Sequence, residues 1–198
     1  MTEKQYGGAT GRGAGEKLAK AAPSKITPNK IKEKKEIMTK KEESNQTDKQ
    51  KILKAGKIAY EVKEYAKKII KKDILLLEIA EKIENKIIEL GGKPAFPVNT
   101  SINEIAAHYT PSADDSSIAH GLLKIDLGVH IDGWIADTAI SIDLENSEQN
   151  KKLIQASKDA LEKAIELIKQ KNNLTTGEIG KKIQETIESK GFLPIINL

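Results

Sequence analysis

The pair Asp132-Gly133 constrains the fold of this chain more than any other feature. It lies between two long apolar runs, residues 124–131 and residues 134–142. A two-residue type I′ turn needs positive φ at both central positions, and Asp-Gly is among the few pairs that adopt it readily. Such a turn joins two antiparallel strands. The sequence therefore predicts a β-hairpin over these residues.

The two faces of this hairpin differ in chemistry. In the predicted register Gly128 faces Asp137 and Asp126 faces Ala139, and side chains alternate between faces along each strand. We expect the apolar face to pack against helices; it carries Ile125, Leu127, Val129, Ile131, Trp134, Ala136, Thr138, Ile140 and Ile142. The other face carries Asp126 and Asp137 as diagonal neighbours. Unpaired buried carboxylates are costly, so a metal or acid–base site and a structural role are equally open from the residues alone.

Helices are predicted on both sides of the hairpin, because apolar residues recur there at three- and four-residue spacing. We expect one helix from Lys51 onward and a second one capped by Asp73. Two more are expected after the hairpin, over about residues 147–171 and about residues 176–190.

The positive charge of the chain lies in its first 50 residues. The 198 residues carry a net charge of +4, of which residues 1–50 hold +5 and the remainder −1. The tail is rich in Lys and Gly with few spaced apolar residues, which predicts disorder. Arg12 is the only arginine, so bidentate recognition of phosphates or bases is largely unavailable, and we expect at most weak tail contacts with nucleic acid. Translation from Met1 and from Met38 are both open.

Composition excludes several other classes of protein. The chain has no cysteine, which rules out disulfide scaffolds, thiolate metal sites and cysteine nucleophiles, and which permits a reducing compartment. No run approaches the roughly 20 apolar residues of a membrane span, and the amino terminus carries no secretory hydrophobic region. We therefore expect a cytoplasmic protein with no membrane partner.

Longer motifs around the hairpin closely resemble those of type 2 methionine aminopeptidases of the archaeal kind. They follow in family order: residues 91–99, 101–111, 124–142 with its Asp-x10-Asp spacing, and 191–198. The resemblance runs from about Lys51 to the end. It implies the α+β pita-bread fold, in which two related halves surround a two-metal centre. It also implies removal of the amino-terminal methionine from nascent proteins.

The resemblance implies roles for four residues. Asp126 and Asp137 are similar to the first two metal ligands of the family, for two divalent ions that could be Co, Mn, Fe or Zn. His108 is similar to an active-site histidine that contacts substrate and stabilises the tetrahedral intermediate without holding metal. Phe96 is similar to a wall of the methionine pocket. The implied partner is the amino terminus of a nascent protein.

Two features depart from the family pattern. The loop Ser112–Gly121 is shorter and lacks the usual Gly-Asp turn, which leaves its conformation open. The chain ends at Leu198, before the family's third metal ligand, a histidine, and before two glutamate ligands. We therefore expect residues 51–198 to be the amino-terminal half of a catalytic domain, inactive unless a carboxyl-terminal half completes it. A truncated gene model and a split enzyme with a separately encoded second half would both account for the missing ligands. Two alternatives stay open: a non-catalytic relative that binds ribosomes or RNA, and an inactive fragment.

Overall fold

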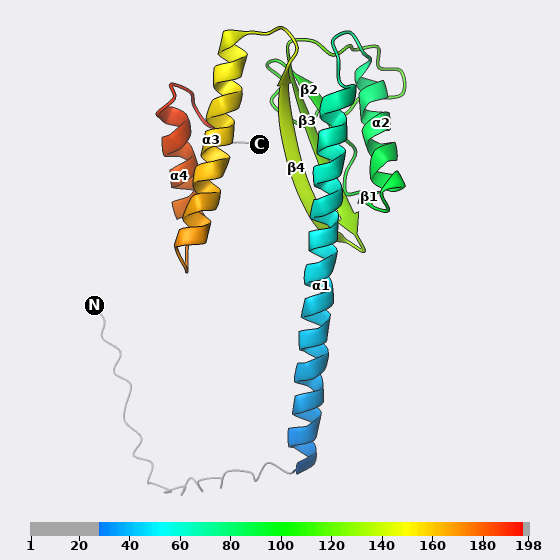
Figure 1. Cartoon of the computed structure of the whole chain (residues 1–198), viewed down its shortest axis with the longest axis vertical. Coiled ribbons are helices and arrows are strands. Elements are labelled where there is room, and N and C mark those ends of the chain that lie inside the picture. Colours follow the sequence, from blue (N-terminus) through cyan, green and yellow to red (C-terminus); the bar gives the residue numbers. More distant parts are fainter. Residues whose placement is uncertain (1–27, 196–198) are drawn as a thin grey trace, which may run out of the picture. The chain divides into compact units, whose positions relative to one another are not determined.

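The structure, a computed structural model, describes residues 28–195, with side chains from residue 47 onward. The chain divides into two compact units, Met1–Glu42 and Glu43–Leu198; in the first, the described residues 28–42 are helical. The elements, labelled in Figure 1, are α1 (Pro28–Ile69), α2 (Leu76–Glu89), β1 (Lys93–Pro94), β2 (Asn99–Ile102), β3 (Leu122–Ile131), β4 (Trp134–Asp143), α3 (Glu148–Gln170) and α4 (Thr176–Glu188).

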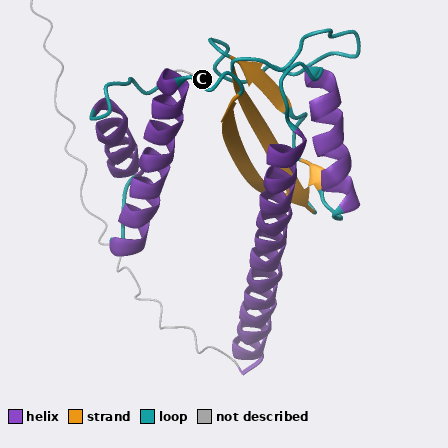
Figure 2. Ribbon diagram, turned by 45° about the horizontal axis from the view of Figure 1, so that its top comes forward, coloured by secondary structure: helices purple, strands orange, loops and turns teal. Residues whose placement is uncertain are grey.

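The four strands form one antiparallel sheet with β3 at its centre (Figure 2). Strand β4 pairs with β3 along its whole length, while β1 and β2 pair with the other edge of β3. The predicted hairpin register is confirmed, because Gly128 faces Asp137 and Asp126 faces Ala139. Both turn residues have positive φ, 50° and 87°, as a type I′ turn requires.

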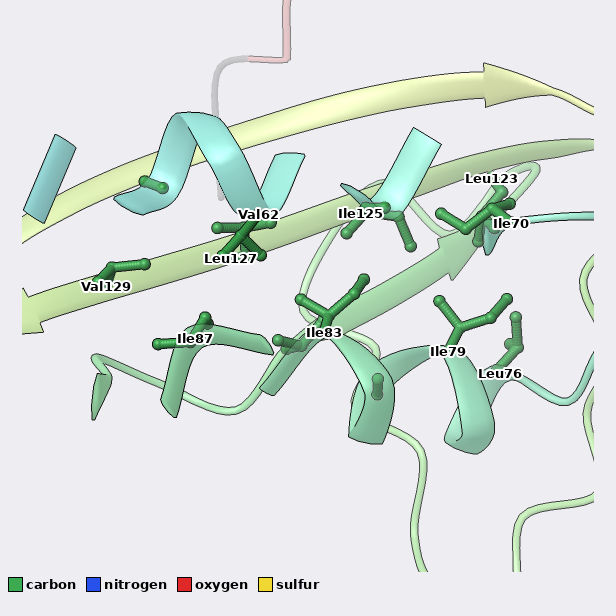
Figure 3. Close-up of a cluster of buried hydrophobic side chains, with 14 of the residues drawn as sticks. Val62, Ile70, Leu76, Ile79, Ile83, Ile87, Leu123, Ile125, Leu127 and Val129 are labelled. Carbon is green, nitrogen blue, oxygen red and sulfur yellow. The ribbon is translucent and has the colours of Figure 1, made fainter. Parts of the chain in front are cut away.

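Helices α1 and α2 pack on the apolar face of β3, as the alternation of the hairpin predicted. Figure 3 shows this core, in which fully buried side chains from both helices meet those of the central strand. The residues of β3 that belong to this core are Leu123, Ile125, Leu127 and Val129, which alternate along the strand. Each large side chain buried in this way stabilises the fold by about 1.5–3 kcal/mol. The side chains between them, including Asp126, lie on the opposite face of the sheet.

Helix α1 begins earlier than the sequence analysis predicted. We expected it from Lys51, after a disordered tail of residues 1–50, but in the structure it begins at Pro28. Residues 29–55 contain neither Pro nor Gly and are rich in Lys, Glu and Gln, which are among the better helix formers. A proline is well tolerated at the first helical position. The rest of the predicted tail, residues 1–27, lies outside the described residues.

The predicted cap of α2 is wrong. The helix begins at Leu76, two residues later than a cap at Asp73 would place it, and its N-cap residue makes no side-chain cap hydrogen bond. Instead, the Leu76 amide donates to the Ser117 carbonyl oxygen at 2.9 Å, and the Asp73 amide donates to that of Ala119 at 2.8 Å. A helix start needs acceptors for its free amides, and here the loop before β3 supplies them.

The two carboxyl-terminal helices agree closely with their predicted bounds. Ser147 caps α3 by accepting the Asn150 amide, and Thr175 and Glu178 form a reciprocal capping box at the start of α4. Hydrogen bonds from Lys171 and from Thr175 lower the pKa of Glu178 to about 2. None of the helices within residues 28–195 is long and apolar enough to cross a membrane.

Candidate metal and substrate site

The structure brings the two predicted metal ligands together. Asp126 on β3 and Asp137 on β4 lie on the sheet face opposite to helices α1 and α2, offset by two positions across Gly128. Asp126 is half-buried and Asp137 is exposed. Their carboxyl groups are near enough for Asp137 to raise the pKa of Asp126. The two carboxyl groups therefore lie diagonally across the hairpin, as predicted, and interact with each other.

This pair is under electrostatic strain. Burial raises the pKa of Asp126, and repulsion by the neighbouring Asp137 carboxylate raises it further. The imidazole of His108 is near enough for its charge to oppose this effect by favouring ionised Asp126. A divalent cation between the two carboxylates would remove their repulsion, so the donor set fits an oxygen-bound metal.

The donor set is nevertheless incomplete within this chain. Among the residues that the structure describes, no group of three or more His, Cys, Asp and Glu side chains is placed to hold a metal ion. Divalent ions such as Mn²⁺ and Zn²⁺ generally take about four to six ligands. A metal centre built on Asp126 and Asp137 would therefore need further ligands from water or from another polypeptide segment.

Phe96 lies against the backbone of β3 between the two aspartates. A Cβ added to Gly128 would come within 2.9 Å of the Ala95 Cβ and still closer to the Phe96 ring. Only glycine leaves room for this approach. The Ala95 amide also donates to the Gly128 carbonyl oxygen at 2.9 Å, which fixes the segment that carries the ring. Phe96 therefore shares a face with the carboxyl pair; its role as a pocket wall stays a prediction.

His108 is placed beside the carboxyl pair by the segment that follows β2. Its side chain is exposed and its φ is 65°, a left-handed conformation that is uncommon for residues other than glycine. The next residue, Tyr109, accepts the Thr100 amide at 2.8 Å and donates its own amide to the Ser101 Oγ at 3.2 Å. Because β2 in turn pairs with β3 opposite Asp126, the backbone at His108 is tied to the strand that carries this carboxyl group.

Asn99 also belongs to this arrangement, although no sequence pattern predicted it. Asn99 lies opposite Asp126 in the sheet and is only 8% exposed. Its side-chain amide donates to the Pro97 carbonyl oxygen at 3.0 Å and to the Thr110 Oγ1 at 2.9 Å. It thereby joins the start of β2 to the segment that follows His108. No local sequence pattern singles out Asn99, because its strand partner Asp126 and its hydrogen-bond partner Thr110 come close to it only in the folded chain.

A groove of about 870 Å³ lies along β4. It is lined by Lys63 and Lys67 of α1, by residues 137–142 of β4, and by α3 residues that include Ile154 and Leu161. Leu161 is 61% exposed, although it is large and apolar. Among the described residues β4 pairs with β3 alone, so its other edge has no strand beside it.

An antiparallel sheet backed by helices on one face is the architecture of the pita-bread fold, and here it places a carboxyl pair beside a histidine and an aromatic ring. Residues 50–197 match metallopeptidase family M24, and the chain belongs to this family.

The curated proteins to which this chain is similar in sequence are methionine aminopeptidases. The chain is 55% identical to that of Methanocaldococcus jannaschii over 151 residues, which are 75% of this chain and 50% of that protein. It is 50% identical to the methionine aminopeptidase of Pyrococcus abyssi and covers 50% of that protein. It is 48% identical to the methionine aminopeptidase of Methanothermus fervidus and covers 85% of that protein. The chain spans about half the length of the first two.

Solved structures show the same fold. The methionine aminopeptidase of Thermotoga maritima superposes with a TM-score of 0.68 at 27% identity, covering 74% of this chain and 62% of that chain. The methionine aminopeptidase of Rickettsia prowazekii superposes with a TM-score of 0.64 at 28% identity, covering 73% of this chain and 60% of that chain. The prolidase of Pyrococcus furiosus, at 24% identity, shares the fold with a TM-score of 0.62 over 73% of this chain and 43% of that one. The family resemblance and the α+β pita-bread fold predicted from the motifs are confirmed.

Proposed function

We propose that this chain supplies half of the active site of a cytoplasmic methionine aminopeptidase, which removes the amino-terminal methionine from nascent proteins. The observation that carries this proposal is the pairing of Asp126 with Asp137 on a face that also holds Phe96 and His108. The names of its relatives support it, because they are methionine aminopeptidases at up to 55% identity. A ribosome- or RNA-binding relative would have no need of a carboxyl pair whose repulsion disfavours folding.

Asp126 and Asp137 would hold two divalent ions, of Co, Mn, Fe or Zn. When bound, such ions supply Lewis-acid polarisation of a carbonyl group and lower the pKa of a water molecule. The carboxylates suit this role because they converge from adjacent strands, which hold them more rigidly than loops would. Their mutual repulsion in the metal-free chain favours occupation by a cation.

The remaining two residues bind and orient the substrate in this proposal. Phe96 offers an apolar surface beside the carboxyl pair, and an aromatic ring there would contact the methionine side chain. His108 extends from the neighbouring segment with an exposed imidazole that can donate a hydrogen bond. Directed at the scissile carbonyl, this donor would stabilise the negative charge that develops on the oxygen.

The other half of the site would come from a carboxyl-terminal half of the fold. Three features support this: the donor set has two carboxylates, the outer edge of β4 has no strand beside it among the described residues, and α3 presents large exposed apolar side chains such as Leu161 and Ile165. A strand added to β4 would lie along the groove that α3 lines.

Reconstitution tests this function. The chain would be co-expressed with the carboxyl-terminal half of the Methanocaldococcus jannaschii relative, and methionine release from a Met-Ala-Ser peptide would be measured with added Mn²⁺ or Co²⁺. We expect release by the pair, none by the chain alone, and loss of release on Asp126→Ala or Asp137→Ala. Asp132→Asn, an exposed turn residue, is the matched control and should retain activity. Release unaffected by Asp126→Ala and Asp137→Ala would refute the metal assignment.

A further inference from the structure

The backbone at His108 needs external support. A positive φ at a residue with a side chain persists only where surrounding contacts hold it. At His108 φ is 65°, and the residue lies outside the regular strands. The contacts that restrain the residues next to His108 therefore determine the position of its imidazole.

Tyr109 carries most of this restraint. Its backbone is hydrogen-bonded to β2 in both directions, through the Thr100 amide and the Ser101 Oγ. Its ring packs against the hydrophobic core. Its hydroxyl donates to the Asp115 Oδ2 at 2.5 Å and lies 3.2 Å from the Ser117 Oγ. One residue thus joins the sheet to the loop that precedes β3.

Asp115 anchors the other end of this contact. Its second oxygen, Oδ1, accepts the Ser117 amide at 2.8 Å, and the Ser117 carbonyl oxygen accepts the first amide of α2. Hydrogen bonds from Tyr109 and from Ser117 hold the pKa of Asp115 below its usual range, so it is an ionised acceptor at neutral pH. Hydrogen bonds to a charged acceptor are stronger than those between neutral groups. A continuous path therefore runs from α2 through Ser117 and Asp115 to the residue after His108.

We propose that Tyr109 and Asp115 are positioning residues, whose hydrogen bond fixes the backbone at His108 and so places its imidazole beside Asp126. The effect on catalysis rests on the aminopeptidase function proposed above, while the effect on the backbone does not. The contact lies at the periphery: Asp115 is only half-buried and is no member of the core, so its loss should loosen the segment without unfolding the chain. Neither side chain touches the substrate in this account.

Backbone dynamics of the full chain test the positioning directly. We would measure ¹⁵N order parameters at the amides of His108 and Tyr109 in the wild type, in Tyr109→Phe, which keeps the ring, and in Asp115→Ala. The wild type should give about 0.85 and both variants less than about 0.6. Asp114→Ala is the matched control, because Asp114 has the same charge in the same loop but accepts its hydrogen bond from the Ser112 Oγ instead. Unchanged order parameters in both variants would overturn the proposal.

A double-mutant cycle in the reconstituted enzyme separates positioning from general stability. Tyr109→Phe and Asp115→Ala should each lower kcat about tenfold with little change in KM, since a misplaced catalytic group costs rate. In a His108→Ala background they should have no further effect, because the group they position is gone. An equal loss in that background would overturn the positioning role. If the wild-type pair releases no methionine, the aminopeptidase function fails, and the order parameters alone decide whether the contact fixes His108.

Discussion

The ring of Phe96 occupies the space that a side chain at residue 128 would need. Gly128 faces Asp137 across the hairpin and lies two residues from Asp126, so this missing side chain lets an aromatic ring reach the surface between the two carboxyl groups. A single glycine in the middle of a ten-residue strand weakens that strand. Here it allows the chain to place an apolar surface beside the two carboxyl groups of Asp126 and Asp137.

Gly128→Ala should therefore destabilise the protein and displace Phe96. The new methyl group would collide with the ring and with Ala95, and overpacking of this kind costs about 1–3 kcal/mol. Chemical denaturation measures the change. Gly56→Ala in α1 is the control: nothing lies within 4 Å of its added Cβ, and alanine there should stabilise by about 0.5–1 kcal/mol. Equal effects of the two substitutions would contradict the packing of Phe96 on β3.

Asp126→Asn should raise the thermal stability of the metal-free chain at neutral pH. The folded-state pKa of Asp126 is raised by burial and by Asp137, so its ionisation destabilises the fold. This destabilising contribution is absent below the ordinary aspartate pKa of about 3.9 and grows as pH rises through the raised value. The difference in Tm between wild type and variant should consequently be positive at pH 7 and vanish near pH 3. Asp132→Asn, at the exposed turn, serves as control, and a Tm difference independent of pH would contradict the account.

The capping box of α4 predicts the opposite pH dependence. The pKa of Glu178 is lowered to about 2 by its hydrogen bonds from Lys171 and Thr175, so ionised Glu178 stabilises the helix. That stabilisation is complete above pH 4.5 and is lost as pH falls through about 2. Glu178→Gln should thus speed hydrogen exchange at the α4 amides at pH 7, with a difference that shrinks toward pH 2. Glu162→Gln on α3 should leave α4 exchange unchanged, and a Glu178→Gln variant that behaves likewise would contradict stabilisation of α4 by the ionised Glu178.

The hairpin could be predicted because its determinants are local. Asp132 and Gly133 fix the turn, and strict alternation then assigns every side chain between residues 124 and 142 to a face. The diagonal pairing of Asp126 with Asp137 follows from these two facts alone. Turn chemistry and strand period thus sufficed to place the two carboxyl groups on one surface.

The surroundings of this pair could not be predicted in the same way, because they depend on contacts between distant segments. Asn99 meets Asp126 only through the pairing of β2 with β3, and Tyr109 meets Asp115 only because the loop folds back. The cap of α2 was wrong for the same reason: Asp73 has the right chemistry for a cap, but the Ser117 carbonyl oxygen takes its place. The early start of α1 reflects helix propensity that a search for apolar spacing overlooks.

The binding of Mn²⁺, measured by electron paramagnetic resonance, tests the central claim that Asp126 and Asp137 form half of a metal centre. The full chain should bind Mn²⁺ weakly, Asp137→Asn should abolish this binding, and Asp132→Asn should not change it. Addition of the carboxyl-terminal half should tighten binding at least tenfold in the wild type and have no such effect in Asp137→Asn. Equal Mn²⁺ binding by the wild type and Asp137→Asn, with or without the second half, would contradict the account.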